Sequence, residues 1–459
     1  MSDHANLATQ NLAVLFLAIE YPPLNTAGVF RSLKFTKYLP AYGVKPVVLT
    51  LDVSDAGVIF GGASDPALLE EIPDSVEIVR VKCDEFVAQK SGRFRRFLQI
   101  YFQIEDRIGS VWRKALLERM PALIAQYGPR AVYVTLPPFS AGRLALAIGR
   151  QYRLPIIVDM RDGWSQWRVG PFGSWFHYYL TLRRERSLLQ AAAAIITVTR
   201  QLAAVFSRTH PGVSEADIQV ITNGYDFDLC LPQTIDVPQR EPTARVVIGY
   251  VGSFYYEPDK QRAHLTPWWR KRFHRKLQYS AVKEDWLYRS PYFFMRALAL
   301  VFERRPELRA VVQFEVMGSD AKWLTEMAES LGIGLSCKFY PRGEYNEVLQ
   351  FQSRCDAFLC TSVKVPGGQD YAIASKTFDY LRYPKPILGF VTKGAQREFL
   401  AESGISLLCD PDELESSSQV LERFVLGGFA LSPNREFLLR FHRQLLASQL
   451  AATIKRVAA

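Results

Sequence analysis

The chain has 459 residues, of which 48% are hydrophobic and 22% are charged, and its formal net charge at pH 7 is +10. This composition is ordinary for a globular enzyme, and the length predicts two or three domains at about 100–200 residues each. No apolar run approaches the ~18 residues that would span a bilayer, which argues against an integral membrane protein. The positive charge favours an anionic partner, and nucleotide sugars, anionic membrane surfaces and nucleic acids all qualify.

The N-terminal stretch MSDHANLATQ lacks the basic and apolar segments of a signal peptide. The six cysteines are scattered and form no Cys-x-x-Cys pair, so neither a zinc site nor a disulfide framework is indicated. We therefore expect a cytoplasmic protein. The cysteines are Cys83, Cys230, Cys337, Cys355, Cys360 and Cys409.

The first half of the chain reads as an alternation of buried strands and helices. Residues 11–19 form an apolar run, the loop EYPPLNTAG follows, and apolar residues recur at helical spacing from about residue 29 to 42. Near-continuous apolar strands predict a parallel sheet that is covered on both faces. Further strands are expected at 46–50, 131–135, 155–159 and 194–198, with a helical, basic stretch at 84–128 and a turn at 223–224.

The segment LPQTIDVPQREPTAR, residues 231–245, is rich in proline and polar residues and is the best candidate for a linker. A buried strand restarts at 246–252, and strands at 311–317 and 357–360 continue the alternation. We therefore expect a first domain over 1–235, a second over 243–432, and one C-terminal helix over 433–459.

Residues 257–292 interrupt this alternation with a stretch that is too long for an ordinary loop between a strand and a helix. The sequence PWWRKRFHRKLQY gathers Arg270, Lys271 and Arg272 beside Trp268 and Trp269. An acceptor site, a membrane-surface patch and a lid would each suit such a segment. The alternative is a solvated basic helix whose aromatic residues are tucked into the core.

Residues 366–389, PGGQDYAIASKTFDYLRYPKPILG, contain groups that could bind a nucleoside diphosphate. A glycine pair allows close approach of a ligand, and Ser375 is the expected N-cap of a short helix. The helix N-terminus and Lys376 suit a phosphate, and the Asp379 carboxylate suits ribose hydroxyls. The alternative is an ordinary capped helix with Lys376 and Asp379 as surface charges.

Several stretches, in order along nearly the whole chain, resemble the retaining glycosyltransferases of family 4 that have the GT-B fold. They are YPPLNTAGVFRSLKFTKYL, LPIIVDMRDGW, AAAAIITVTRQLA, IQVITNGYDFD, VIGYVGSF and ASKTFDYLRYPKPILG. The resemblance implies two facing, doubly wound, Rossmann-like domains with the active site in the cleft between them. It also implies a nucleotide-sugar donor and a glycan, lipid-linked or small-molecule acceptor, as in polysaccharide biosynthesis.

In the first domain the resemblance points to two loops. Gly28, just after the first strand, would face the donor, and Arg31 would reach a phosphate, unless they are a turn glycine and a surface charge. Arg161 and Asp162 follow a buried strand, and Asp162 is the candidate for contacting acceptor or sugar hydroxyls and assisting deprotonation. The alternative is an internal network of Asp159, Arg161 and Asp162 that shapes the loop.

In the second domain, the amides of Gly252 and Ser253 would bind a phosphate, together with Lys376 and Thr377, and Asp379 would bind the ribose. The family places a basic residue after the Gly252 turn; here Lys260, Arg262 and Arg289 all remain candidates. The family's first glutamate of an E-x7-E pair is Tyr371 here, so its sugar contact passes to Asp370 or to backbone groups. Those backbone candidates are Gly367, Gly368 and Gln369.

The sequence thus predicts a retaining, metal-independent glycosyltransferase, with Lys376 and Asp162 as its catalytic residues. Asp226 and Asp228 form an Asp-x-Asp, but they trail the turn beside the linker and are read as structural. We expect no metal and no cofactor, no nucleic acid, and contact with the inner face of an anionic membrane. The alternatives are a nucleic-acid- or anion-binding protein without catalysis, and a nucleotide-sugar epimerase of the same fold.

Overall fold

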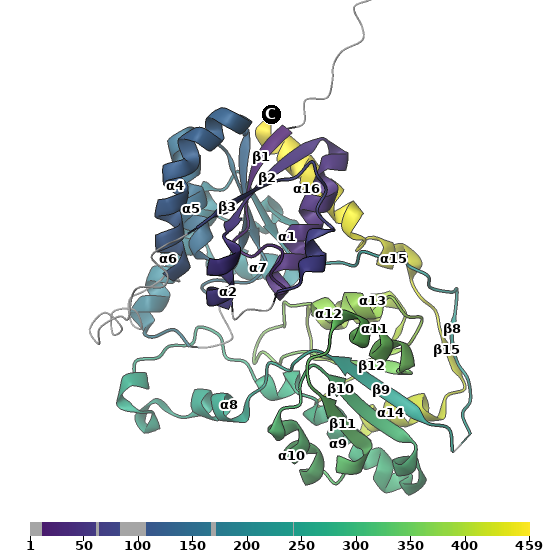
Figure 1. The fold of residues 1–459 in the computed structure, drawn as a ribbon. Helices are drawn as coiled ribbons and strands as arrows, with labels where there is room; N and C mark the ends of the chain where they lie inside the picture. The colour runs from purple at the N-terminus through teal and green to yellow at the C-terminus, as the bar shows by residue number, and fades with distance from the viewer. Residues whose placement is uncertain (1–11, 61–63, 83–106, 167–170, 242) are drawn as a thin grey trace, which may run out of the picture. The chain divides into compact units, whose positions relative to one another are not determined.

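The computed structural model describes residues 12–60, 64–82, 107–166, 171–241 and 243–459. The chain folds into two compact units (Figure 1). Unit 1 comprises residues 1–226, 274–281 and 442–459, and unit 2 comprises residues 227–273 and 282–441.

Unit 1 is built on a seven-stranded parallel sheet with the order β3-β2-β1-β4-β5-β6-β7. Its central strands are buried along most of their length, as their unbroken apolar sequences predict. Val14 of β1 is opposite Ala131 of β4, so these two neighbours come from distant parts of the chain. The strands are β1 (Leu12–Leu17), β2 (Val44–Leu51), β3 (Glu77–Val81), β4 (Ala131–Leu136), β5 (Ile156–Met160), β6 (Ala194–Thr197) and β7 (Ile218–Val220).

Helices cover both faces of this sheet. Figure 1 shows α1 and α16 together on one face and α4, α5 and α6 on the other. The core on the α16 face includes Phe16 and Tyr133, whose rings stack at 4.3 Å, and Leu450 of α16. The helices are α1 (Ala27–Tyr38), α2 (Val53–Phe60), α4 (Arg107–Tyr127), α5 (Ser140–Tyr152), α6 (Trp175–Ala191), α7 (Arg200–Thr209) and α16 (Arg443–Ala458), with 3-10 turns at Leu39–Tyr42, Pro66–Leu69 and Glu215–Asp217.

Unit 2 repeats the arrangement with a six-stranded parallel sheet of order β11-β10-β9-β12-β13-β14. Its strands are β9 (Val246–Val251), β10 (Val312–Met317), β11 (Cys337–Tyr340), β12 (Ala357–Thr361), β13 (Ile387–Phe390) and β14 (Ser406–Cys409). A separate antiparallel pair joins β8 (Ile235–Val237) to β15 (Phe429–Leu431).

In unit 2, α9, α10 and α14 lie on one side of the sheet, and α11, α12 and α13 on the other (Figure 1). Phe294 of α9 packs at the centre of the core against Phe314 and Phe390. The helices are α8 (Pro258–Leu265), α9 (Tyr292–Arg304), α10 (Lys322–Ser330), α11 (Tyr345–Arg354), α12 (Ser375–Tyr380), α13 (Ala395–Ser403), α14 (Leu414–Leu426) and α15 (Arg435–Leu439), with 3-10 turns at Trp268–Arg270, Phe273–Arg275, Trp286–Arg289, Pro306–Ala310 and Gly334–Ser336.

The boundaries of the units differ in detail from those expected. The chain leaves unit 1 after Asp226, and the proline-rich segment 231–245 lies within unit 2, where its residues 235–237 pair with β15. Where one helix over 433–459 was expected, α15 belongs to unit 2 and α16 to unit 1. Between them the backbone is extended at His442, whose side chain accepts a hydrogen bond from the Gln444 amide at the start of α16.

The insert 257–292 is not a basic helix with a buried aromatic face. After α8 it contains only short 3-10 turns, and Trp268, Trp269, Phe273 and Leu277 expose between 62% and 89% of their surfaces. Residues 274–281 belong to unit 1, where Tyr279 forms a two-way backbone bridge with Phe172.

Both sheets reverse their strand order beside their first strand. In unit 1 the reversal lies between β1 and β4, and in unit 2 between β9 and β12. Parallel sheets of this kind bind ligands outside the carboxyl ends of the strands at such a point. The candidate ligand-binding loops are therefore those after β1, β4 and β5 in unit 1, and those after β9 and β12 in unit 2.

Candidate functional site

In unit 1, Arg161 ties together the loops that follow β1, β4 and β5. Its guanidinium donates to the carbonyl oxygen of Gly28 at 2.9 Å and to that of Pro137, and it lies 3.6 Å from the Glu20 carboxylate. A Cβ on Gly28 would come within 2.5 Å of Glu20 Oε1 and 2.7 Å of Arg161 Nη1. A larger residue at position 28 would therefore displace the ends of these two side chains, whether or not a ligand is bound.

Arg31 is buried and has no donor left for a phosphate. Its guanidinium forms a two-pronged ion pair with Asp159 at 2.7 and 2.8 Å and donates to the carbonyl oxygens of Ile221 and Thr222, both at 2.9 Å, and to Asn223 Oδ1 at 3.3 Å. Arg31 was expected to contact a phosphate or, as the alternative, to be a surface charge, and the structure shows neither. A fully paired buried arginine is a structural element that joins α1 to β5 and to the end of β7.

Asp159 is fully buried and also accepts a hydrogen bond from Tyr133. Burial and the Asp159 carboxylate raise the pKa of Tyr133 well above its ordinary value, so the phenol remains a donor. Asp162, three residues further on, is half-buried and lies at the carboxyl edge of the sheet, where an acceptor-side contact was expected. The segment does take part in internal contacts, as the alternative supposed, but with other partners: Asp159 pairs with Arg31, and Arg161 donates to the carbonyl oxygens of Gly28 and Pro137.

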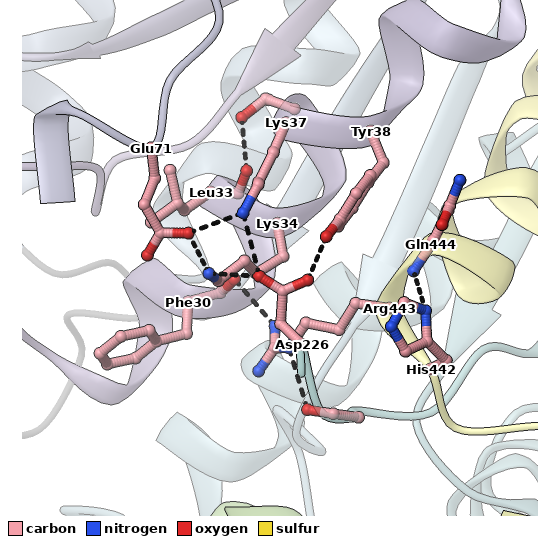
Figure 2. A network of polar contacts seen from close by, with 12 residues as sticks. Phe30, Leu33, Lys34, Lys37, Tyr38, Glu71, Asp226, His442, Arg443 and Gln444 are labelled. Carbon is pink, nitrogen blue, oxygen red and sulfur yellow. Dashed lines mark hydrogen bonds and ion pairs between the residues drawn. The ribbon is translucent and has the colours of Figure 1, made fainter. Parts of the chain in front are cut away.

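Asp226 is a structural anchor at the point where the chain leaves unit 1. Figure 2 shows its carboxylate against Lys34, Lys37 and Tyr38 of α1. Burial acts to raise the pKa of Asp226, but hydrogen bonds from Lys34 and Tyr38 outweigh it and lower the pKa to about 2. Among the described residues, no three His, Cys, Asp or Glu side chains come together as a metal site.

Neither Asn223 nor Gly224, where a turn was expected, has a left-handed backbone conformation. Arg443, the first residue of α16, holds this segment from the side: its guanidinium donates to the carbonyl oxygens of Gly224 and Phe30, both at 2.9 Å (Figure 2). The segment that leaves unit 1 and the segment that returns to it are thus fixed to the same helix, α1.

In unit 2, Lys376 reaches back to the glycine turn at the end of β9. Its Nζ lies 3.7 Å from the ring centroid of Tyr250 and 3.1 Å from where a Cβ of Gly252 would be. Gly252 has φ +96° and packs against the backbone of Gly318, which follows β10. No side chain fits between the two turns, and the Gly252 amide donates to the carbonyl oxygen of Met317 at 2.7 Å, so it is not free for the phosphate contact expected of it.

The Lys376 ammonium forms no ion pair or hydrogen bond with any described residue. Burial lowers its pKa to about 7, and the nearby Arg289 acts in the same direction, whereas Asp379 opposes it. Arg289 comes from the end of the insert, and its side chain lies over the ring of Tyr255 at 5.2 Å. Of the three candidates for the basic residue after the Gly252 turn, Arg289 is thus the one that acts on Lys376.

Helix α12 is capped differently from the expectation. Its N-cap is Ala374 rather than Ser375, and no side chain caps it. Gln396 Oε1 accepts hydrogen bonds from the Ala374 amide at 2.8 Å and from Thr377 Oγ1 at 3.1 Å. Thr377 is fully buried and its hydroxyl is bonded to Gln396, so it does not make the phosphate contact expected of it. Asp379 is exposed, as a ribose contact requires.

The loop between β12 and α12 has a fixed base and an exposed tip. Asp370 is buried, its carboxylate accepts the amides of Val363 at 3.3 Å and Ala372 at 3.0 Å, and Tyr371 is buried beside it. Asp370 therefore fixes the loop and does not replace the missing glutamate. The exposed tip consists of Gly367, which has φ +71°, Gly368 and Gln369.

One family model matches part of unit 1. Residues 33–224 match the model of the glycosyl transferase 4-like domain. The match includes Arg161 and Asp162 and ends at Gly224, so it leaves out the whole of unit 2. No curated protein matches the sequence of the chain.

Solved structures match the chain over both units. A glycosyltransferase from Rickettsia africae is 12% identical, with a TM-score of 0.55 over 97% of this chain and 98% of its own. The lipopolysaccharide outer core galactosyltransferase WaaB is 13% identical, with a TM-score of 0.55 over 97% and 100%. The N-terminal domain of the trehalose-6-phosphate phosphatase of Candida albicans is 11% identical, with a TM-score of 0.57 over 97% and 97%. At these identities the likeness concerns the fold, and the chain has the GT-B fold.

Several residues around the two sites were not singled out from the sequence. Glu20 lies in the loop three residues after β1, and Tyr250 lies in β9, two residues before Gly252. Their place beside a strand end was a usable signal, because side chains at the carboxyl edge line the site. Gln396 gave no local signal, since only the folded chain brings it to α12.

The paired arrangement of Arg31 predicts a stability defect rather than a binding defect. Arg31→Lys removes two of the five donors and breaks the two-pronged contact with Asp159, which we expect to cost about 3 kcal/mol in the free energy of unfolding. Arg150→Lys, at an exposed position of α5, is the control and should be neutral. Thermal unfolding with and without nucleoside diphosphates measures both. A variant of normal stability that binds nucleotide more weakly would return Arg31 to the phosphate site.

The lowered pKa of Lys376 predicts that this residue costs stability at low pH. Below pH 7 the folded protein holds a charged amine in a poorly solvated place, and this cost fades between pH 7 and the unfolded value of 10.5. Lys376→Met should therefore raise the unfolding temperature more at pH 6 than at pH 9, with a gain of about 2 kcal/mol at pH 6. An equal gain at both values would contradict the lowered pKa.

Proposed function

We propose that the protein is a retaining glycosyltransferase that takes a sugar from a nucleoside-diphosphate donor. The observation that carries the proposal is the Lys376 ammonium, which lies at the Gly252 turn without an anionic partner. A cation in a poorly solvated place is costly unless it pairs with an anion, and a diphosphate supplies one. The fold and the family match of unit 1 agree with such a donor.

In this proposal the donor binds to unit 2. Lys376 and Arg289 contact the diphosphate, with the amide of Ser253. The Gly252 amide, which was expected to join it, instead donates to the carbonyl oxygen of Met317 at 2.7 Å. Asp379 accepts the ribose hydroxyls, and the exposed backbone of Gly367, Gly368 and Gln369 contacts the sugar.

The acceptor is a glycan, a lipid-linked glycan or a small molecule, and Asp162 of unit 1 contacts its hydroxyl. The bond between the anomeric carbon and the diphosphate breaks, and the acceptor oxygen forms the new bond to that carbon with retention of configuration. The acceptor proton passes to a base, for which Asp162 is the candidate. Lys376 and Arg289 stabilise the charge that develops on the leaving diphosphate, so the proposal requires no metal ion and no cofactor. Arg161 acts by holding the Gly28 loop.

Two other functions are distinguished by experiment. A nucleotide-sugar epimerase of the same fold would convert the donor into its epimer, still joined to the nucleoside diphosphate, without any acceptor, whereas a transferase releases nucleoside diphosphate when acceptor is present. A nucleic-acid-binding protein would give a salt-sensitive gel shift through the basic, aromatic insert and show no binding of nucleotide sugars.

Mutation of the donor site tests the proposal. We expect Lys376→Ala to lower donor turnover about 100-fold, because it removes a charge that stabilises the leaving group. Asp379→Ala should lower turnover about tenfold through the lost ribose contact. The control is Lys322→Ala, an exposed lysine of α10. The donor is first found by thermal shift with uridine, guanosine and adenosine diphosphates and their sugars. If both variants keep wild-type turnover, unit 2 does not bind the donor as proposed.

We also propose that the insert contacts an anionic membrane from the cytoplasmic side. No helix in the described part of the chain is long and apolar enough to cross a bilayer. Trp268, Trp269 and Phe273 are exposed next to Arg270 and Arg272. Exposed tryptophans among basic residues suit the boundary between lipid headgroups and acyl chains.

Liposome sedimentation tests this contact. Arg270→Glu with Arg272→Glu should abolish binding to phosphatidylglycerol vesicles, because each basic residue near an anionic surface contributes about 1 kcal/mol. Lys322→Glu with Lys338→Glu makes the same change in net charge at exposed positions of unit 2 and should leave binding intact. A wild type that never binds these vesicles, or equal loss in both variants, would contradict the role of the insert.

A further inference from the structure

A buried carboxylate of unit 1 holds the loop that carries Asp162. Glu185 lies in the middle of α6 and is fully buried. Its Oε1 accepts the amide of Trp164 at 2.9 Å, and its Oε2 accepts the amide of Ser165 at 3.1 Å and the hydroxyl of Ser165. The backbone immediately after Asp162 and Gly163 is therefore bonded to a side chain of a helix rather than to the sheet.

His210 completes this arrangement from a third element. It is fully buried at the C-terminal end of α7, and its Nε2 lies 2.9 Å from Glu185 Oε2. Its Nδ1 has no hydrogen-bond partner among the described residues, so Nε2 carries the proton and donates to Glu185. Gln166 Nε2 adds a further donor at 3.3 Å.

The loop is fixed on both sides of Asp162. Before it, the Arg161 amide donates to the Leu136 carbonyl oxygen at 2.8 Å, and the Arg161 side chain is bonded to the neighbouring loops. After it, the ring of Trp164 stacks on Phe139 at 5.2 Å with an angle of 4°, while its amide is bonded to Glu185. Asp162 and Gly163 are the two residues between these anchors.

Folding stability alone does not favour a buried carboxylate at position 185. A carboxylate loses its hydration when it is buried, and several hydrogen bonds are needed to compensate, whereas apolar side chains of similar volume achieve the same packing without that cost. The carboxylate does offer a convergent acceptor for adjacent amides, which sets the position of a loop precisely.

We infer that Glu185, supported by His210, is a positioning residue that sets Asp162 for the transfer reaction. The inference rests on the proposed function, because it assigns Asp162 to the acceptor side. It predicts that loss of the carboxylate lowers the rate of the chemical step without weakening donor binding, since the donor is held by unit 2.

The test is Glu185→Gln in the full-length protein. The glutamine has nearly the same shape, but whichever way its amide is turned, an N–H group faces at least one N–H donor of the loop. We expect kcat to fall by about tenfold or more while KM for the donor stays within about twofold. Amide hydrogen exchange at Trp164 and Ser165 should become faster.

Glu315→Gln is the matched control. Glu315 is also a buried carboxylate, but it lies on β10 of unit 2 and pairs with Arg245 at 3.0 Å and Arg354 at 2.6 Å. It should lose stability without losing kcat. His210→Gln, which retains a donor near the position of Nε2, should keep more activity than His210→Phe.

The outcomes separate this inference from the proposed function. A wild-type kcat in Glu185→Gln, or losses of kcat in both glutamine variants in proportion to their unfolding temperatures, would overturn the positioning role alone. A wild type that shows neither a thermal shift with any nucleoside diphosphate nor release of one from its sugar would overturn the proposed function, and this inference with it.

Discussion

The Lys376 ammonium lies against the Gly252 turn and forms no ion pair or hydrogen bond with any described residue. Several buried charged groups in unit 1 do have partners: Arg31 with Asp159, Asp226 with two lysines, and Glu185 with the loop amides and His210. A folded protein tolerates an unpaired, poorly solvated cation only at a cost in stability, and such costs concentrate where a ligand is bound. This lack of an anionic partner among the described residues is the basis for proposing that unit 2 binds an anion.

The two units use charge in different ways. In unit 1, buried ion pairs and hydrogen bonds fix the loops at the carboxyl edge of the sheet, and Arg161 joins three of them. In unit 2, the turns at Gly252 and Gly318 bring the backbone after β9 close to that after β10. Lys376 lies beside them and forms no ion pair with any described residue. In the proposed mechanism, the fixed position of Asp162 and the unpaired ammonium of Lys376 are both forms of preorganisation. Preorganisation lowers the free-energy cost of reaching the transition state.

The sequence predicted the fold well because buried parallel strands and the helices between them leave strong local patterns. Residues 12–17 and 246–251 are apolar almost throughout, and each is followed by a glycine-bearing loop. The stretch at 375–380 was recognised as a helix for the same reason. Lys376 and Asp379 were proposed as donor contacts from their positions on this short helix, and that assignment stays a prediction.

The roles of Arg31, Thr377 and Asp370 were not predictable in this way. Arg31 lies at helical spacing in a loop-to-helix segment typical of phosphate sites, but its partner Asp159 is 128 residues away. Thr377 and Asp370 are turned inward by Gln396 and by backbone amides of a loop. In the insert, the alternative of a helix with its aromatic residues in the core was wrong. Trp268, Trp269 and Phe273 lie in short 3-10 turns, which leave them exposed.

The most direct test of the central claim is an NMR titration of the Lys376 side chain, observed by selective labelling, in the free protein and with a bound nucleoside diphosphate. The account predicts a pKa of about 7 for the free protein, because burial opposes the charge, and a clear rise when the diphosphate supplies its anion. A pKa near the ordinary value of 10.5 in the free protein, or one that does not change with any nucleoside diphosphate, would contradict it.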